Sequence, residues 1–197
     1  MKILVLLCLT SFFSCLIASG KTVIIDAGHG GRDIGGHRGK VYEKHLALDT
    51  AMRIEYYLKK KGYQTVMIRS KDVFVPLSTR AKMANLYQDA IFISVHYNST
   101  WKKHVHGLET FYHSAQSKAL AQACHYGMHG KVSAGDRGVK SARYYVLRHC
   151  RHPAILVEGG FLSNRSECAK TMKGTYRDKL ARGIVDGVVK FDKVSVW

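Results

Sequence analysis

The chain has 197 residues, of which 46% are hydrophobic and only two are proline, so it is long enough for one ordinary domain and too apolar for a disordered protein. Its formal net charge is +17, with lysine and arginine spread along the whole length. A charge of this size fits either a soluble basic surface or an anionic polymer as substrate or neighbour. Nucleic acid is not expected as a partner, because no zinc-finger spacing or aromatic–basic recognition motif accompanies the charge.

Residues 1–20 have the pattern of a secretory signal peptide. Lys2 precedes an apolar stretch over residues 3–17, which is short for a membrane span, and residues 18–20 are small, as at a cleavage site. We therefore expect secretion across the inner membrane to the periplasm or cell envelope, with residues 21–197 as the mature domain. An uncleaved anchor is the alternative, whereas a lipid-attachment site fits poorly because two phenylalanines come before the small residue.

Three cysteines remain in the mature domain, at positions 124, 150 and 168. An odd number leaves at least one thiol free or paired with another chain. A bridge between Cys150 and Cys168 is open in an oxidising compartment, and none of the three has the paired spacing of a zinc site. We interpret them as structural residues.

Three apolar runs each end in a side chain that can bind a metal or transfer a proton. The runs, at residues 23–25, 91–95 and 154–157, are followed by His29, His96 and Glu158. Runs that are apolar throughout are typical of buried parallel strands covered by helices on both faces. Ligands bind at the carboxyl ends of such strands. We therefore expect the three side chains to converge, although they are far apart in the sequence.

The remaining pattern alternates between helices and strands. A glycine-rich loop is expected over residues 32–42, and a helix begins at Glu43 and ends before Gly62, a natural C-cap. The other expected elements are strands at 63–68, 108–112 and 143–147, helices at 77–87, 114–129 and about 174–191, and a loop at 133–140. This alternation predicts an α/β fold: a single-domain three-layer sandwich with a mainly parallel twisted sheet and helices on both faces.

Two imidazoles and one carboxylate form the ligand set of a hydrolytic zinc site. His29 and His96 supply the nitrogens, and either Glu43 or Glu158 supplies the oxygen. The other glutamate is then available to take a proton from a zinc-activated water and pass it to a leaving amine. Glu43 as ligand and Glu158 as base suits both positions, because a carboxyl at the end of a buried strand tends to have a raised pKa.

Other histidines are rival ligands. His125 and His129 are four residues apart on an expected helix, a spacing used in helical zinc sites. No acid follows the first of them, so we interpret the pair as an exposed basic helix face. Asp26 is expected to orient His29 or its turn. The four loop histidines, which we interpret as surface residues, are His104, His106, His149 and His152.

Six motifs occur in a fixed order along the mature chain. They are D-A-G-H-G-G (residues 26–31), Glu43, S-V-H-Y-N (94–98), G-L-E-T-F (107–111), R-G-V-K (137–140) and V-E-G-G-F-L-S-N (157–164). The series resembles the zinc-dependent N-acetylmuramoyl-L-alanine amidases of bacterial cell walls. The resemblance implies one catalytic Zn²⁺ held by His29, Glu43 and His96, with Glu158 as the catalytic acid–base. It also implies cleavage of the amide between N-acetylmuramic acid and L-alanine in peptidoglycan, for wall remodelling or cell separation.

Two further motif residues, Asn98 and Arg137, are candidates for substrate binding. Tyr97 departs from the family pattern, which more often has a small residue there, and it is a candidate for altering the groove. Some relatives carry an inserted helix that blocks the zinc, and no such insertion is evident, so we expect an open site. We also expect a monomer whose basic surface attracts anionic wall polymers.

Ser99 and Lys102 match S-x-x-K, the nucleophile motif of penicillin-binding enzymes. A serine-based D,D-carboxypeptidase activity is therefore a further alternative, although no K-T-G partner is found and a polar loop explains the pattern more simply. A zinc carboxypeptidase acting on wall peptides is the nearest alternative enzyme. A catalytically silent wall-binding activator is disfavoured, because such a protein is expected to lack a ligand or the base.

Overall fold

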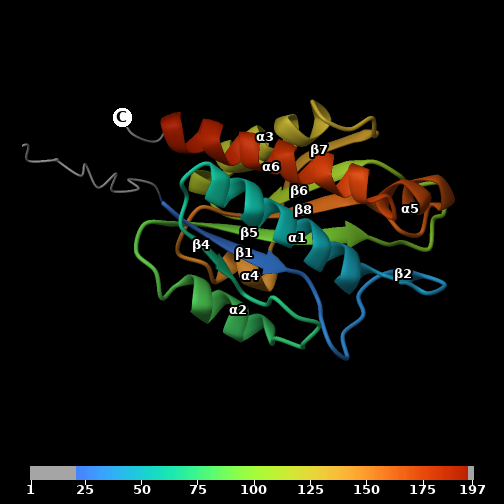
Figure 1. Cartoon of the computed structure of the whole chain (residues 1–197), viewed down its shortest axis with the longest axis horizontal. Coiled ribbons are helices and arrows are strands. Elements are labelled where there is room, and N and C mark those ends of the chain that lie inside the picture. Colours follow the sequence, from blue (N-terminus) through green and yellow to red (C-terminus); the bar gives the residue numbers. More distant parts are fainter. Residues whose placement is uncertain (1–20, 195–197) are drawn as a thin grey trace, which may run out of the picture.

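A six-stranded sheet forms the centre of the computed structural model, which describes residues 21–194 (Figure 1). The strands lie in the order β4-β1-β5-β8-β6-β7. They are β1 (Thr22–Ala27), β4 (Thr65–Met67), β5 (Ala90–Asn98), β6 (Leu108–Tyr112), β7 (Asp136–Ser141) and β8 (Ala154–Phe161). All neighbours pair in parallel except β6 and β8, which are antiparallel. The expected mainly parallel sheet is confirmed.

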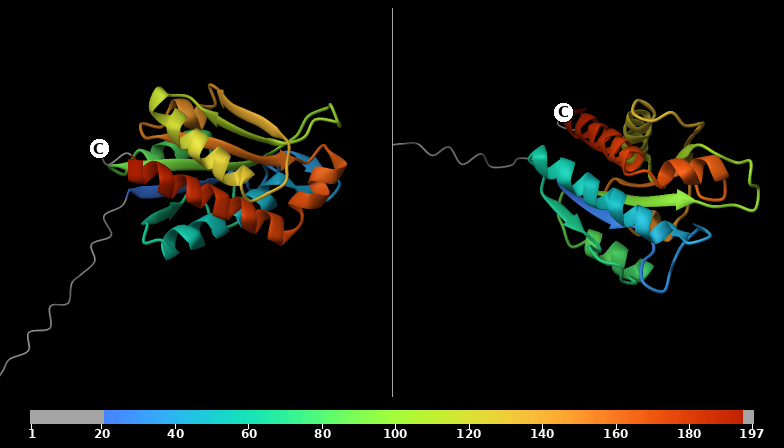
Figure 2. Two further views of the ribbon diagram at one scale, coloured as in Figure 1. Left: turned by 90° about the horizontal axis from the view of Figure 1, so that it is seen from above. Right: turned by 45° about the vertical axis from the view of Figure 1, so that its right-hand side comes forward.

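Helices cover both faces of this sheet (Figures 1 and 2). One face carries α1 (Glu43–Lys60), α3 (Ala115–His129) and α6 (Gly174–Val194), and the other carries α2 (Leu77–Ala84) and α4 (Tyr145–Arg148). A short helix, α5 (Arg165–Thr171), follows β8. The three-layer sandwich predicted from the sequence is therefore present.

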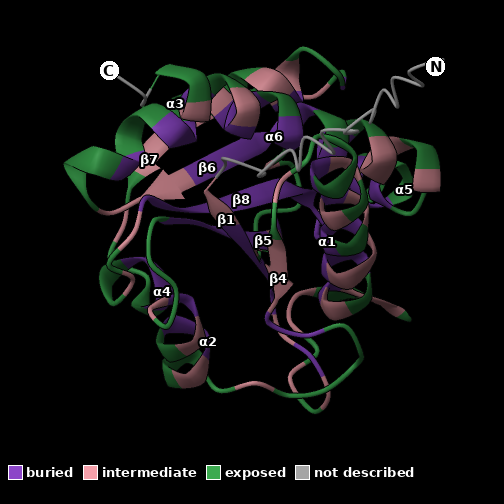
Figure 3. Cartoon of the chain, turned by 60° about the vertical axis from the view of Figure 1, so that its left-hand side comes forward, coloured by how far each residue is buried: buried purple, intermediate pink, exposed green. Residues whose placement is uncertain are grey.

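Strand β1 shows why an uninterrupted apolar run belongs in this position. Side chains alternate between the two faces of a strand. Val23 and Ile25 pack in the core beneath α1, α3 and α6, whereas Ile24 packs in the smaller core beneath α2 and α4, and all three are fully buried. Figure 3 shows the same pattern for the sheet as a whole: the strands are largely buried, and exposed residues lie on the outer faces of the helices.

Helices α3 and α6 approach each other closely, and glycine makes the approach feasible. A Cβ atom at Gly183 would lie 2.4 Å from the carbonyl oxygen of Gly127, which is too close for any side chain. Gly127, which lowers the intrinsic helix propensity of α3, is therefore part of the contact between the two helices.

Two predicted elements are wrong. Residues 133–140, expected as a loop, contain β7, an edge strand that pairs only with β6. An edge strand needs only one partner and tolerates a polar sequence such as D-R-G-V-K-S, so no apolar alternation marked it. Residues 143–147, expected as a strand, instead lead into helix α4, in which Val146 and Leu147 are buried. Burial of these two side chains overrides the strand propensity of a short Tyr/Val segment.

Smaller elements were missed in the segments expected to be loops. A two-stranded hairpin, β2 (His37–Arg38) with β3 (Val41–Tyr42), lies inside the loop before α1. Helix α5 lies in the segment that follows β8, and the side chain of Asn164 caps it by accepting hydrogen bonds from the backbone N–H groups of Ser166 and Glu167. An asparagine followed by a glutamate three residues later is a recognisable helix start.

The three cysteines within residues 21–194 form no disulfide bond. Cys124, Cys150 and Cys168 are all free thiols, so the alternative of a bridge is not realised in this fold. The predicted signal peptide at residues 1–20 lies outside the described residues. Within residues 21–194, no helix combines the length and apolar character needed to cross a membrane.

Candidate metal centre

His29 lies in a turn with an unusual backbone. Its φ is 59°, and the two glycines that follow it also have positive φ values. This conformation costs a non-glycine residue about 1–2 kcal/mol. Two buried arginines support it by binding the backbone: Arg80 donates to the carbonyl oxygen of His29 (2.7 Å), and Arg69 donates to that of Gly28 (2.7 Å).

Asp26 contributes to this turn indirectly. Its carboxylate accepts hydrogen bonds from Arg80 (2.6 Å) and from the hydroxyl of Ser94 (2.7 Å). The imidazole of His29 is held by a different acid, because its Nδ1 lies 2.9 Å from Asp33 Oδ2. Asp33 lies in the glycine-rich loop, where no motif or spacing pointed to it. A carboxylate on Nδ1 leaves Nε2 directed at a ligand position, as in many metal sites.

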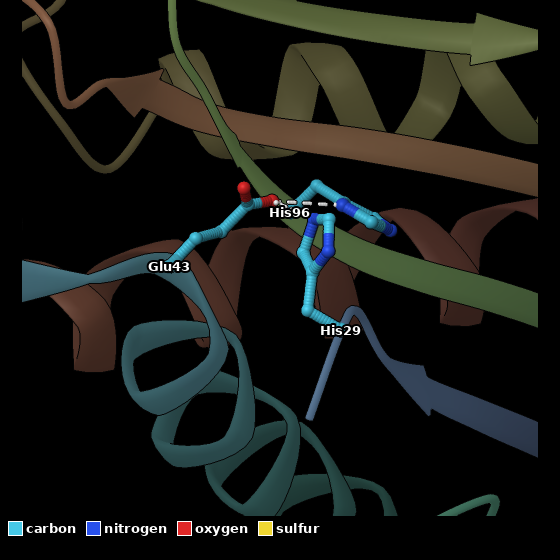
Figure 4. Close-up of side chains that lie close together, drawn as sticks. All are labelled: His29, Glu43 and His96. Atoms are coloured by element: carbon cyan, nitrogen blue, oxygen red, sulfur yellow. Dashed lines mark hydrogen bonds and ion pairs between the residues drawn. The ribbon is translucent and has the colours of Figure 1, made fainter. Parts of the chain in front are cut away.

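Three side chains from three different elements meet at the carboxyl end of β5 (Figure 4). Glu43, the first residue of α1, places Oε1 3.0 Å from His29 Nε2 and 2.8 Å from His96 Nδ1. The two imidazole rings meet edge to face with centroids 4.9 Å apart. The possible ligand atoms all lie within 4.8 Å of one another. The structure thus brings together the three residues that the family resemblance pairs with zinc.

The surrounding backbone fixes the Glu43 carboxylate. Its Oε1 accepts a hydrogen bond from the backbone N–H of Tyr97 (3.0 Å), and its Oε2 accepts one from Gly36 (2.7 Å). Glycine is required close to the cluster: a Cβ atom at Gly28 would lie 2.4 Å from the His96 ring. The absence of a side chain at Gly28 therefore leaves the space that the His96 ring occupies.

Electrostatics keep the Glu43 carboxylate ionised, as a metal ligand must be, and hold a proton on His29 that a metal would displace. Burial alone raises the pKa of Glu43, but hydrogen bonds from His29 and His96 outweigh it and hold that pKa well below its usual range. Burial lowers the pKa of His29, whereas the carboxylates of Glu43 and Asp33 raise it further, so the net shift is upward. A bound cation replaces these protons, because it interacts with the same lone pairs.

Glu158 lies beside the cluster on β8. It pairs across the sheet with His96 of β5 on one side and with Glu109 of β6 on the other. Its Oε2 is buried and has no hydrogen-bond partner among the described residues. Burial, followed by the negative charges of Glu43 and Glu109, raises its pKa well above the usual value for a glutamate.

These residues fit a catalytic zinc site. Two imidazole nitrogens and one carboxylate leave a fourth position open, as in hydrolytic zinc centres. The unpartnered Glu158 carboxyl is the feature that a purely structural metal site does not need. The cluster opens into a cleft of about 560 Å³ between α2 and α4. The exposed apolar and aromatic residues that line this cleft are Phe74, Leu77, Tyr144 and Tyr145.

Asn98 and Arg137, the candidate substrate-binding residues, are joined by a third side chain. Glu109 accepts hydrogen bonds from Asn98 Nδ2 (2.8 Å), from Arg137 Nε (2.8 Å) and from Lys140 Nζ (2.5 Å). Sequence reasoning assigned no role to Glu109. A lone acid inside the otherwise uncharged strand L-E-T-F-Y was the signal that could have found it, because such a charge needs partners.

Ser99 and Lys102 do not form a nucleophile pair among the described residues. The backbone N–H of Ser99 donates to Asn98, and the ammonium of Lys102 lies over the ring of Trp101, 5.0 Å from its centroid. Tyr97 is fully buried, and its hydroxyl lies 2.6 Å from the hydroxyl of Thr50 on α1. Its side chain therefore belongs to the core rather than to the cleft.

The interpretation of His125 and His129 as an exposed helix face is wrong. His125 is buried and contacts Thr110 and Asp136, and His129 is half-buried. The error arose because Asp136 comes from a strand that the sequence did not reveal. Of the four loop histidines, His104, His106 and His149 are exposed and His152 is half-buried.

An α/β sandwich with a His/Glu/His cluster and an unpartnered glutamate at its strand ends has the architecture of a metal-dependent hydrolase. Residues 23–190 match the family described as N-acetylmuramoyl-L-alanine amidase. The chain therefore belongs to this family, which confirms the resemblance seen in the six motifs.

Individual relatives agree with this assignment. N-acetylmuramoyl-L-alanine amidase LytC of Bacillus subtilis is 36% identical over 176 residues, which are 87% of this chain and 36% of LytC. The chain thus spans about a third of that relative. The catalytic domain of CwlV from Bacillus (Paenibacillus) polymyxa var. colistinus has a TM-score of 0.85 and 35% identity, covering 90% of this chain and 99% of that one. An N-acetylmuramoyl-L-alanine amidase from Clostridium difficile 630 has a TM-score of 0.84 and 37% identity, covering 87% and 96%.

Proposed function

We propose that this domain hydrolyses the amide bond between N-acetylmuramic acid and L-alanine in peptidoglycan, using one zinc ion. The observation that carries the proposal is the position of Glu158: its buried, unpartnered oxygen lies beside three converging ligands at the base of an open cleft. Family membership supplies the substrate, because the similar proteins are named for this reaction.

In this proposal His29, Glu43 and His96 hold the metal. Asp33 keeps His29 in the orientation that presents Nε2, and the backbone N–H groups of Gly36 and Tyr97 keep the Glu43 carboxylate in place. When bound, zinc supplies Lewis acidity, which polarises a scissile carbonyl and makes a nearby water more acidic. Asp26 acts as a positioning residue by holding Arg80, which in turn holds the backbone of His29.

Glu158 is the proposed acid–base. Its Oε2 takes a proton from the attacking water and delivers it to the amino group of the leaving L-alanine. A raised pKa suits both steps, because a carboxyl that titrates nearer neutrality accepts and returns a proton more readily than an ordinary glutamate. Since its Oε2 has no hydrogen bond to give up among the described residues, the proton affinity of this oxygen is available to the reaction.

The cleft offers two kinds of surface for the substrate. Asn98 lines the cleft and contacts Glu109, which also holds Arg137 and Lys140, so polar and cationic groups for peptide carbonyls and carboxylates lie next to the cleft. Phe74 and Tyr144 provide apolar faces on which a sugar ring can pack. A glycopeptide, which is apolar on its sugar faces and charged on its stem peptide, matches this combination.

The cellular setting is part of the same proposal. We propose export through residues 1–20 to the periplasm or cell envelope, a role in wall remodelling or cell separation, and attraction of the +17 chain to anionic wall polymers. A monomer suffices, because all four residues of the centre come from one chain. N-terminal sequencing of the exported protein tests the export step: a start near Lys21 supports it, and an intact Met1 contradicts it.

Product analysis of digested peptidoglycan tests the reaction. The mature protein should release stem peptides with a free L-alanine amino terminus, and a chelator or Glu158→Gln should abolish the release. Ser99→Ala serves as the matched control in the same cleft and should digest at the wild-type rate. If D-alanine is released in the presence of the chelator, but not by Ser99→Ala, the nucleophile is Ser99. If D-alanine is released and the chelator abolishes the release, the protein is a zinc carboxypeptidase. Absence of any product from zinc-loaded protein would indicate a binding module or activator.

A further inference from the structure

A second histidine–carboxylate cluster lies outside the cleft. His125 and His129 are one turn apart on α3, and Asp136 opens the neighbouring strand β7 (Figure 1). His125 Nε2 lies 2.9 Å from Asp136 Oδ1, and His129 Nε2 lies 3.7 Å from the same oxygen. Ligand atoms of the three residues all lie within 4.8 Å of one another, and none of the three lines the cleft.

His129 is the feature that ordinary packing leaves unexplained. Its Nε2 is inaccessible to solvent and has no hydrogen-bond partner among the described residues. The nitrogen nevertheless lies 3.7 Å from the Asp136 oxygen, a distance too long for a hydrogen bond and suited to two ligands of one ion.

Thr110 forms a hydrogen bond with the ring nitrogen of His125 that does not contact Asp136. Its hydroxyl lies 2.9 Å from His125 Nδ1, on the side of the ring away from Asp136. A hydroxyl can donate or accept, so Thr110 is compatible with either tautomer of the imidazole. It can therefore accept a hydrogen bond from Nδ1–H when Nε2 binds a cation, which is the usual outer contact of a metal-binding histidine.

We propose that His125, His129 and Asp136 form a second zinc site, with a fourth position for water. Ligand atoms around a tetrahedral zinc lie about 3.3 Å apart, given bonds of about 2.0–2.1 Å. The two distances to Asp136 Oδ1, 2.9 and 3.7 Å, bracket this value, so small side-chain movements complete the geometry. Two imidazoles and one carboxylate favour zinc over calcium or magnesium, which prefer oxygen ligands.

The site has a structural consequence for the cleft. Asp136 is the first residue of edge strand β7, and Arg137, the next residue, reaches Glu109 beside Glu158. A cation shared by α3 and β7 ties this edge strand to the helix that covers the sheet. Zinc at the second site is therefore expected to stabilise β7 and the two cationic side chains, Arg137 and Lys140, by which β7 contacts Glu109. We assign no reaction to this cluster.

Zinc stoichiometry of the mature, tag-free protein tests the proposal, measured by dialysis against Zn²⁺ and elemental analysis. The variant His29→Ala/His96→Ala removes the cleft site and should retain one zinc per chain. Adding His129→Ala should reduce the content to zero, whereas adding His104→Ala, an exposed histidine, should leave it at one. If His129→Ala does not fold by circular dichroism, Asp136→Asn in the same background takes its place.

A second readout is hydrogen exchange over residues 136–141. Zinc should slow exchange there in His29→Ala/His96→Ala, and the slowing should vanish when His129→Ala is added. The proposal would be overturned if the His29→Ala/His96→Ala variant contained no zinc. It would also be overturned if adding His129→Ala or Asp136→Asn did not change the zinc content of that variant. Because the test is made without the cleft ligands, its result is independent of the amidase proposal.

Discussion

The two histidine–carboxylate clusters use the same kinds of ligand and differ in everything around them. In the cleft, the proposed ligands come from the end of β1, the start of α1 and the end of β5, and beside them lies a buried glutamate whose Oε2 has no hydrogen-bond partner among the described residues. In the second cluster, two ligands are one turn apart on α3 and the third comes from an edge strand. A ligand set alone therefore does not define an active site; an adjacent base and an open cleft do.

The largest expected effect comes from removing the base. Glu158→Gln should lower kcat by about 10²–10⁴-fold, because the amide cannot take up the proton of the attacking water. The zinc content should not change, since Glu158 is not among the ligands. Turnover of purified peptidoglycan and elemental analysis of the same sample measure both. A variant that loses its zinc along with its activity would assign Glu158 to the ligand set instead.

The second-largest expected effect, on zinc affinity, comes from replacing Asp33, the carboxylate that contacts His29. Asp33→Asn should weaken zinc binding at the cleft by about 10–100-fold, because His29 loses the carboxylate that orients it. The matched change at the second cluster is Thr110→Val, which keeps the shape but removes the hydroxyl behind His125. It should weaken only the second site. Competition with a chromophoric chelator measures both affinities, and a loss at both sites from either variant would show that the clusters are coupled.

The contact between α3 and α6 holds in place the helix that carries His125 and His129, and it contributes to the free energy of unfolding. Gly183→Ala should lower the free energy of unfolding by about 1–3 kcal/mol, because the new methyl group meets the Gly127 carbonyl. Gly130→Ala is the matched control: its φ is −66° and its nearest neighbours are 3.6 Å away, so it should be neutral or stabilising by up to about 1 kcal/mol. Urea denaturation distinguishes the two, and equal effects would contradict the close approach.

The smallest expected effect is a shift in pH dependence. Activity should fall as the pH drops through the pKa of Glu158, because the protonated carboxyl cannot accept a proton. The negative charge of Glu109 contributes to the raised pKa of Glu158, after burial and the charge of Glu43. Glu109→Gln should therefore move the acidic limb of the kcat/KM profile to lower pH, and a limb that moves upward or stays would exclude Glu109 as an electrostatic neighbour of the base.

The sequence predicted the parts of the molecule that follow from burial. The strands that carry His29, His96 and Glu158 are apolar throughout, and a parallel sheet brings their ends together. The parts that were missed depend on partners outside the local segment. Strand β7 tolerates a polar sequence because only one of its edges is paired among the described strands. His125 was wrongly expected to be exposed because Asp136, the residue it contacts, belongs to that strand.

The position of β8 in the sheet has a consequence for the order in which the enzyme is completed. All three cleft ligands lie within the first 96 residues, but β8 carries Glu158 and lies between β5 and β6, pairing with both. Neither half of the sheet can join the other until residues 154–161 have been synthesised and inserted. Such long-range strand pairing is slow to form, because a large loop must close first. If Glu158 is the base, a growing chain therefore holds the complete set of proposed ligands long before it holds the base, and we expect hydrolysis to begin only when β8 is in place.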